Sequence, residues 1–303
     1  MNTAEELKEI VRQKYGEIAL TDDAQGVACG CGPSSCCGPA NTDTSYSILM
    51  NDEYTAINGY AADADLGLGC GLPTQFAQIK PGDVVIDLGS GAGNDCFVAR
   101  AGTGEKGRVI GLDMTAPMID RARKNAKTLG YTNVEFVYGD IEDMPLPNNL
   151  ADVVVSNCVM NLVPDKAKAF AETYRILKPG GHFSISDIVL VGELPNGLQR
   201  DAELYAGCVS GAIQQADYLR IVAEVGFINV QVQQRKVISL PQELLLTYLT
   251  ENDIQAYRQD GQGIFSITVF AQKPSAIQNA TPVLAQLAVA QPGASCCGPD
   301  CCS

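Results

Sequence analysis

The sequence predicts a doubly wound α/β fold, a mostly parallel sheet with helices on both faces. Between residues 84 and 187, short runs of β-branched residues alternate with amphipathic stretches of helical length, a pattern typical of right-handed βαβ units. The first run, Val84–Leu88, leads into a glycine-rich turn at residues 89–93 and then into a helical pattern. Two late apolar runs, at residues 227–232 and 264–270, are expected to extend the same sheet.

Length and charge restrict the class of protein. The 303 residues, 46% of them apolar, suffice for a large hydrophobic core. A net charge of −14, with 21 lysines and arginines scattered along the chain, argues against nucleic-acid binding, which needs a basic surface. The first residues are acidic and amphipathic, and no apolar run approaches the roughly 20 residues of a membrane span. We therefore expect a cytoplasmic protein that binds neither nucleic acid nor membrane.

Local patterns predict the elements in chain order. Thr3 and Glu6 form a capping-box pair before an apolar-periodic stretch, which predicts a helix over residues 3–15. The alternating part then predicts strand 84–88, helix 95–101, strand 108–113, helix 116–129, strand 134–138, strand 152–156, helix 165–177, turn 178–181 and strand 183–187. After these come helical patterns around 197–207 and 216–225, an amphipathic stretch near 241–250, and a last strand that we expect to be antiparallel at or near an edge.

Composition divides the chain into three regions. Residues 1–65 hold the first helix and a loop rich in Gly, Pro and Ser that carries four cysteines. Residues 66–272 form the α/β domain, with an insertion at about 189–226 that is expected to cover the substrate edge of the sheet. Residues 273–303 are a low-complexity linker with a flexible, cysteine-rich tail.

Cysteine usage is the second unusual feature. The 12 cysteines form two terminal clusters and four isolated positions: Cys29, Cys31, Cys36 and Cys37; Cys70, Cys96, Cys158 and Cys208; Cys296, Cys297, Cys301 and Cys302. In a reducing compartment, clustered thiols indicate soft-ion binding or thiol chemistry rather than disulfide staples. Zinc remains an alternative for the terminal clusters only, since the paired CxxC spacing of structural zinc sites is absent.

Three aspartates at strand ends indicate the ligand of the glycine turn. Asp113, at the end of the second strand, suits two ribose hydroxyls. Asp87 lies inside the first strand, where a carboxylate opposes a pyrophosphate but suits a cation. S-adenosylmethionine has a sulfonium, an ammonium and no phosphate, so this pair predicts that cofactor rather than NAD. Asp140 is placed to reach an adenine amino group and Ile141 to pack on the ring. The alternative is an ordinary turn with helix-capping aspartates.

Three of the isolated cysteines are expected to converge at the same edge. Cys158 directly follows the fourth strand, and ligands of doubly wound sheets bind outside the carboxyl ends of strands. Cys70 lies in a glycine-flanked loop before the first strand, and Cys208 lies in the insertion. Soft thiolates select soft ions, and trivalent arsenic takes three sulfurs. The alternative for each is a small buried apolar side chain, which fits Cys96 best.

Three segments, Asp87–Cys96, Gly111–Thr115 and Val155–Lys166, together resemble the arsenite S-adenosylmethionine methyltransferase family. The resemblance covers about residues 66–272, and Ser156–Leu162 is its most specific part. It implies a Rossmann-like class I methyltransferase sheet and a role in arsenic detoxification.

The resemblance also implies the site residues. Three cysteines bind trivalent arsenic, and an N-terminal cysteine takes part in a disulfide relay, with the choice among Cys29, Cys31, Cys36 and Cys37 open. The expected catalytic set is Cys70, Cys158, Cys208 and Cys37. The expected cofactor-binding set is Asp87, Gly89, Ser90, Gly91, Gly93, Asp113, Met114, Asp140, Ile141 and Asn157.

The implied reaction is an in-line attack of the arsenic lone pair on the sulfonium methyl group. No general base is needed because arsenic loses no proton, so the single histidine, His182, is expected to be a bystander. Arsenic binds thiolates, and the expected partners are arsenite or its thiol conjugates and a reductant such as glutathione or thioredoxin. Two alternatives remain: a methyltransferase of the same fold acting on a small organic substrate, and a thiol-rich protein that sequesters soft metals.

Overall fold

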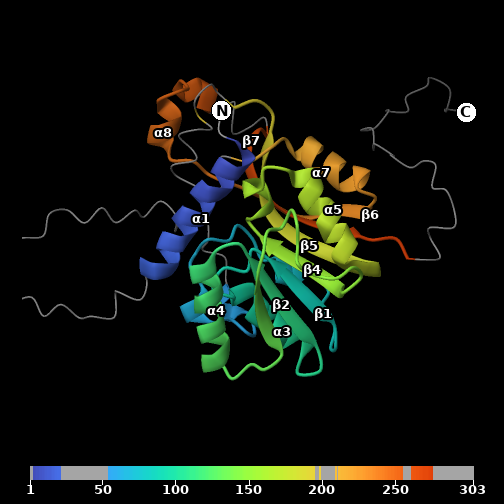
Figure 1. The fold of residues 1–303 in the computed structure, drawn as a ribbon. Coiled ribbons are helices and arrows are strands. Elements are labelled where there is room, and N and C mark those ends of the chain that lie inside the picture. Colours follow the sequence, from blue (N-terminus) through green and yellow to red (C-terminus); the bar gives the residue numbers. More distant parts are fainter. Residues whose placement is uncertain are drawn as a thin grey trace, which may run out of the picture.

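A seven-stranded sheet forms the centre of the computed structural model, which describes residues 3–21, 54–194, 198, 209, 211–254 and 261–275 (Figure 1). Within these residues the strands are β1 Val84–Leu88, β2 Arg108–Asp113, β3 Val134–Tyr138, β4 Ala151–Asn157, β5 Leu177–Val191, β6 Ile228–Val237 and β7 Gly263–Gln272. Their order is β3-β2-β1-β4-β5-β7-β6. The strands β1 to β5 pair in parallel, and β7 is antiparallel to both β5 and β6. The expected mostly parallel, doubly wound sheet is confirmed.

Helices cover both faces of this sheet. The described helices are α1 Ala4–Thr21, α2 Pro73–Phe76, α3 Asn94–Thr103, α4 Ala116–Thr128, α5 Lys166–Ile176, α7 Gln215–Glu224 and α8 Gln242–Leu246. Side chains alternate along β1, so Ile86 packs with α5 and α7 on one face, while Val85 packs with α3 and α4 on the other. Asp87 lies on the same face of β1 as Val85, and its side chain is buried. The alternation thereby places the carboxylate of Asp87 under the start of α3.

The N-terminal helix is longer than the sequence predicts and lies beside α4 at the carboxyl ends of the strands (blue in Figure 1). Its capping box forms as expected: the Thr3 N–H donates to Glu6 Oε2 at 2.7 Å, and the Glu6 N–H donates to Thr3 Oγ1 at 3.2 Å. Lys8 Nζ then reaches across the sheet end to Asp140 Oδ2 at 2.6 Å and Glu142 Oε2 at 2.7 Å. A helix predicted from its cap and apolar spacing alone is therefore tied to the end of β3.

The segment 178–181, predicted as a turn, lies inside the long strand β5. Ala151 pairs with Leu177 and Val153 pairs with His182, so a step of two residues on β4 matches a step of five on β5. The intervening residues bulge out, with Gly180 at a φ of 85°, and pairing then resumes. The glycines and proline thus mark an interruption of the ladder rather than its beginning.

The helices and the last strand that the sequence predicts beyond residue 187 have different outcomes. The helical pattern at 216–225 forms α7, and the stretch near 241–250 contains α8. The pattern at 197–207 lies outside the described residues except for Leu198. The last run is antiparallel as expected, one strand in from the edge that β6 forms. Every helix among the described residues is too short or too polar to cross a membrane.

Asp187 is a carboxyl group buried within β5, a position that the sequence analysis assigned no role. It is inaccessible to solvent, and its Oδ1 accepts a hydrogen bond from the Ile188 N–H at 2.9 Å. Burial raises the pKa of Asp187 to about 7, against the opposing attraction of the Lys166 ammonium. The folded chain therefore retains a proton here over a pH range in which an unfolded aspartate has lost it.

This shift predicts that Asp187→Asn stabilises the protein more at pH 8 than at pH 5. A carboxyl whose pKa is raised by folding makes the free energy of unfolding fall as pH rises from the unfolded to the folded pKa. Between pH 5 and pH 8 the gain of the variant over wild type should grow by about 3 kcal/mol, since each of about two pKa units corresponds to about 1.4 kcal/mol. Urea unfolding at both values measures it, and a pH-independent difference would contradict the assignment.

Candidate active site

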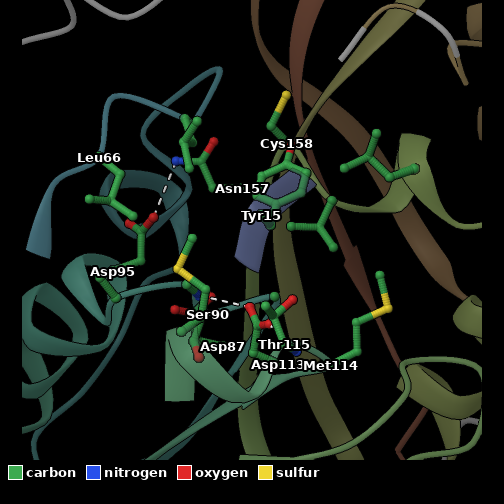
Figure 2. Close-up of a pocket in the computed structure, with 18 of the residues that line it drawn as sticks. Tyr15, Leu66, Asp87, Ser90, Asp95, Asp113, Met114, Thr115, Asn157 and Cys158 are labelled. Atoms are coloured by element: carbon green, nitrogen blue, oxygen red, sulfur yellow. Dashed lines mark hydrogen bonds between the residues drawn. The ribbon is translucent and has the colours of Figure 1, made fainter. Parts of the chain in front are cut away.

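A pocket opens at the carboxyl ends of β1, β2 and β4 and is bounded on one side by α1 (Figure 2). Its lining comes from α1, from the loop before α2, from the glycine turn after β1, and from the residues that follow β2, β3 and β4. Of the expected cofactor positions, all but Gly93 line this pocket: Asp87, Gly89, Ser90, Gly91, Asp113, Met114, Asp140, Ile141 and Asn157. The topology thus brings together residues from four separate strand ends.

The glycine turn forms a cradle whose backbone faces the pocket. Gly89, Gly91 and Gly93 have φ values of 70°, 50° and 99°, in the left-handed region that glycine adopts without strain. A Cβ on Gly93 would lie 2.9 Å from both Phe97 and Phe136, whereas one on Gly91 would meet nothing within 4 Å. The space beside Gly91 is open to a ligand. The Ser90 Oγ is buried and has no hydrogen-bond partner among the described residues.

Asp113 is held in place by backbone donors. Its Oδ2 accepts from the Gly91 N–H at 2.9 Å and its Oδ1 accepts from the Thr115 N–H at 2.8 Å. A carboxylate has about four acceptor positions, and the Thr115 side chain and the Met114 N–H also interact with Asp113, so ribose hydroxyls would share its oxygens with these donors. This arrangement fits the two ribose hydroxyls of a nucleoside, with Met114 and Met118 in the adjacent lining.

Three buried carboxyl groups, Asp87, Asp95 and Asp113, share the pocket wall. Burial raises the pKa of all three, and that of Asp95 lies at about 6; the Asp95 charge further raises the pKa of Asp87. Neighbouring carboxylates in a poorly solvated site are stabilised by a positive charge among them. The pocket therefore favours a cationic ligand, which fits the sulfonium and ammonium of S-adenosylmethionine.

The Asp140 side chain lines the pocket and has two partners within the chain. Besides the Lys8 ion pair, its Oδ1 accepts from the Glu142 N–H at 2.9 Å. Burial alone would raise the pKa of Asp140, but the hydrogen bonds from Lys8 and the Glu142 N–H, together with the charges of Lys8 and Arg12, outweigh it and the pKa is lowered. Any contact with an adenine amino group would use the remaining acceptor positions of an ion-paired carboxylate.

The thiol side of the pocket is apolar. Cys70 and Cys158 are 4% and 3% exposed, and neither forms a disulfide with another described residue. They belong to one hydrophobic cluster with Ile188, Leu190, Val209 and Ala212, among others. Cys158 also lines the cofactor pocket. Cys208 and Cys37 lie outside the described residues, as do Cys29, Cys31 and Cys36, but Val209, the sequence neighbour of Cys208, lies in this cluster.

Cys96 and His182 do not line the pocket. Cys96 Sγ is 3.3 Å from Asp87 Oδ2, and burial together with the Asp87 charge raises the pKa of this thiol well above its usual value, so it remains protonated. His182 Nε2 is 2.6 Å from the Ala77 carbonyl oxygen, and its ring packs on Phe270. No group of three His, Cys, Asp or Glu side chains within the described ranges could hold a metal ion.

Sequence patterns missed several residues of the pocket. Lys8, Val11 and Tyr15 line it from α1, and Tyr54 and Asp95 line it as well. The α1 residues carried no signal because their contacts span more than a hundred positions in sequence, as in the separation of 132 between Lys8 and Asp140. Asp95 did carry a signal, because it is an acidic residue in the first turn of a helix. An acidic residue at that position is equally explained by its favourable interaction with the helix dipole.

Comparisons with known proteins agree with this geometry. A family model described as a methyltransferase domain matches residues 79–226. The chain is 39% identical over 277 residues to an arsenite methyltransferase of Halobacterium salinarum, an alignment that covers 89% of this chain and 68% of that protein. It is 36% identical over 183 residues to the arsenite methyltransferase of Homo sapiens, covering 57% of this chain and only 48% of the human protein.

A solved structure shows the same relationship. The crystal structure of CrArsM, an arsenic(III) S-adenosylmethionine methyltransferase from Chlamydomonas reinhardtii, superposes with a TM-score of 0.56 at 30% sequence identity and covers 77% of this chain and 74% of that one. These similarities agree with the class I sheet, with the acidic pocket at its carboxyl edge and with the adjoining pair of buried thiols. The chain belongs to the arsenite methyltransferase family.

Proposed function

We propose that the chain transfers a methyl group from S-adenosylmethionine to trivalent arsenic bound by Cys70, Cys158 and Cys208. One observation carries the proposal: Cys158 both lines the acidic cofactor pocket and packs in one buried cluster with Cys70. A thiol ligand of arsenic at this position would hold the substrate against the cofactor site. The curated relatives named above are arsenite methyltransferases, which supports the same substrate.

The polar residues of the pocket would bind the cofactor and orient it. When bound, S-adenosylmethionine supplies a methyl group on a cationic sulfur, which the arsenic lone pair attacks in line. Asp113 would orient the ribose, the Ser90 hydroxyl would complete a hydrogen bond in the turn, and Asp87 would attract positive charge. Positioning of this kind lowers the barrier by converting an encounter of two molecules into a step within one complex.

The thiols bind arsenic by exchange. At each cysteine an As–S bond forms while the S–H bond and one As–OH bond break. The thiol proton leaves with the hydroxyl as water, and the arsenic keeps its lone pair. The apolar cluster around Cys70 and Cys158 excludes water from this side. Because no proton leaves arsenic during methyl transfer, the site needs no general base, and His182 lies outside the pocket lining. Only reduced thiols bind, so we expect glutathione or thioredoxin as a reducing partner.

Removal of a thiol ligand should abolish most of the activity. Cys158→Ser and Cys208→Ser are each expected to lower kcat/KM for arsenite at least about 100-fold, more than the loss typical of a residue that only supports a ligand. Chromatographic separation of methylated arsenicals measures turnover. Cys96→Ser is the matched thiol control and should retain most of the activity, because Cys96 lies outside the pocket lining and serine keeps a donor to Asp87. Near-normal turnover by both serine variants would contradict the proposal.

The two kinds of aspartate should differ in how they affect cofactor binding. Asp113→Asn is expected to weaken S-adenosylmethionine and its demethylated product S-adenosylhomocysteine about equally, by roughly tenfold, since the loss is a charge-assisted hydrogen bond to ribose. Asp87→Asn should weaken the cationic S-adenosylmethionine more than the product, which lacks the sulfonium charge. Isothermal titration with both ligands separates the effects, and an equal loss in Asp87→Asn would refute the electrostatic role.

A further inference from the structure

The carboxamide of Asn157 joins the two segments that carry the described thiols. Asn157 is the last residue of β4 and directly precedes Cys158. Its Oδ1 accepts from the Cys70 N–H at 2.8 Å and from the Gly71 N–H at 3.2 Å, and its Nδ2 donates to the Gly71 carbonyl at 2.9 Å. One side chain thus binds three backbone groups of the Cys70 loop, 86 or 87 residues away in sequence.

A second layer holds the carboxamide itself. Asn157 Nδ2 lies 2.7 Å from the Tyr54 hydroxyl oxygen and 3.2 Å from Asp95 Oδ2, the bond marked in Figure 2. The Tyr54 hydroxyl lies 2.9 Å from both oxygens of Asp95, and both residues are buried. Tyr54 and Asp95 fix which end of the carboxamide points toward the Cys70 N–H.

The glycines on both sides of Cys70 fit this arrangement. A Cβ on Gly69 would lie 2.5 Å from Asn157 Nδ2, and one on Gly71 would lie 2.6 Å from Ser186 Oγ. The loop therefore approaches the end of β4 as closely as its backbone allows. On the other side of the loop, Ser266 Oγ donates to the Cys70 carbonyl oxygen. Cys70 is held at both its N–H and its C=O.

The Cys158 backbone is fixed just as firmly. Its φ is 61°, a left-handed conformation that is unfavourable for a residue with a side chain. Its N–H donates to the Ser186 carbonyl oxygen at 2.8 Å. This geometry turns the thiol out of the strand direction immediately after Asn157, toward the cluster that contains Cys70.

We propose that Asn157 is a positioning residue that sets the separation of the Cys70 and Cys158 thiols for trivalent arsenic, an inference that rests on the proposed function. Two sulfurs that share one soft ion, each at about 2.3 Å as in zinc thiolate sites, must lie within a few ångströms of each other. The Asn157 carboxamide directly links the loop that carries Cys70 to the strand end that carries Cys158. This role differs from the cofactor contact that the sequence suggested for Asn157.

The test compares arsenite and cofactor binding in Asn157→Ala, Asn157→Asp and Asn133→Ala. Asn157→Ala is expected to weaken arsenite binding and raise the arsenite KM about 10–100-fold, as for residues that orient a metal ligand. The S-adenosylmethionine dissociation constant should rise by a smaller factor, because the variant removes one donor to Asp95 and leaves the Tyr54 hydroxyl in place. Asn157→Asp keeps an oxygen that accepts from the Cys70 N–H and should recover part of the arsenite affinity.

Asn133→Ala is the matched control for stability. Asn133 Nδ2 bridges the carbonyls of Gly104 and Gly107 at 2.9 Å each, away from the pocket, so its loss should lower stability without changing arsenite affinity. Equilibrium dialysis of the reduced full-length chain measures arsenite affinity, isothermal titration measures S-adenosylmethionine affinity, and urea unfolding reports stability.

If Asn157→Ala fails to fold, Tyr54→Phe provides a second test. This variant removes one support of the carboxamide and should weaken arsenite binding by a smaller factor.

The outcomes are distinct. A raised S-adenosylmethionine dissociation constant with unchanged arsenite affinity would make Asn157 a cofactor contact and overturn the proposal. A loss of stability matching Asn133→Ala with no change in arsenite affinity would make it purely structural, which also overturns it. Wild-type protein that binds arsenite without methylating it would refute the proposed function instead, and the arsenite affinities would still decide the role of Asn157.

Discussion

The way in which β4 ends is the constraint on which the site depends. At this point the chain passes from Asn157, whose side chain binds the Cys70 loop, to Cys158, whose backbone takes a left-handed conformation. The parallel neighbours β1 and β5 fix the position of β4, through pairs such as Leu88 with Ser156 and Asn157 with Ser186. A rigid sheet thereby sets the place of two thiols that would otherwise depend on loops.

The acidic wall of the pocket imposes a second constraint, since buried carboxyl groups are costly unless they are solvated by protein donors. Each has such donors. Asp113 receives two backbone N–H groups, Asp95 receives the Tyr54 hydroxyl and the Asn157 amide, and Asp87 receives the Cys96 thiol. The same donors orient the carboxylates, so the field that favours a cation is prearranged. The Asp95 network also links the cofactor side of the site to the thiol side.

Sequence alone predicted the parts of this site that depend on local pattern. The β-branched runs, the glycine turn and the capping box of Thr3 each carry a short-range signal, and the parallel topology then places Cys158 at the ligand edge. The predicted turn at 178–181 was wrong, because these residues form a bulge within β5. Glycine and proline occur at such a bulge as well as at the start of a strand. The Lys8 ion pairs and the Asn157 bonds to the Cys70 loop depend on tertiary contacts between distant segments, which no local pattern encodes.

The central claim is that arsenic binds at the sheet edge through Cys70, Cys158 and Cys208 rather than at the terminal cysteine clusters. X-ray absorption spectroscopy of one equivalent of arsenite on the reduced full-length chain tests it most directly. The account predicts three sulfur neighbours around arsenic, and the loss of one of them in Cys158→Ser. An arsenic environment identical in wild type and in Cys158→Ser would place the metalloid elsewhere in the chain and contradict the account.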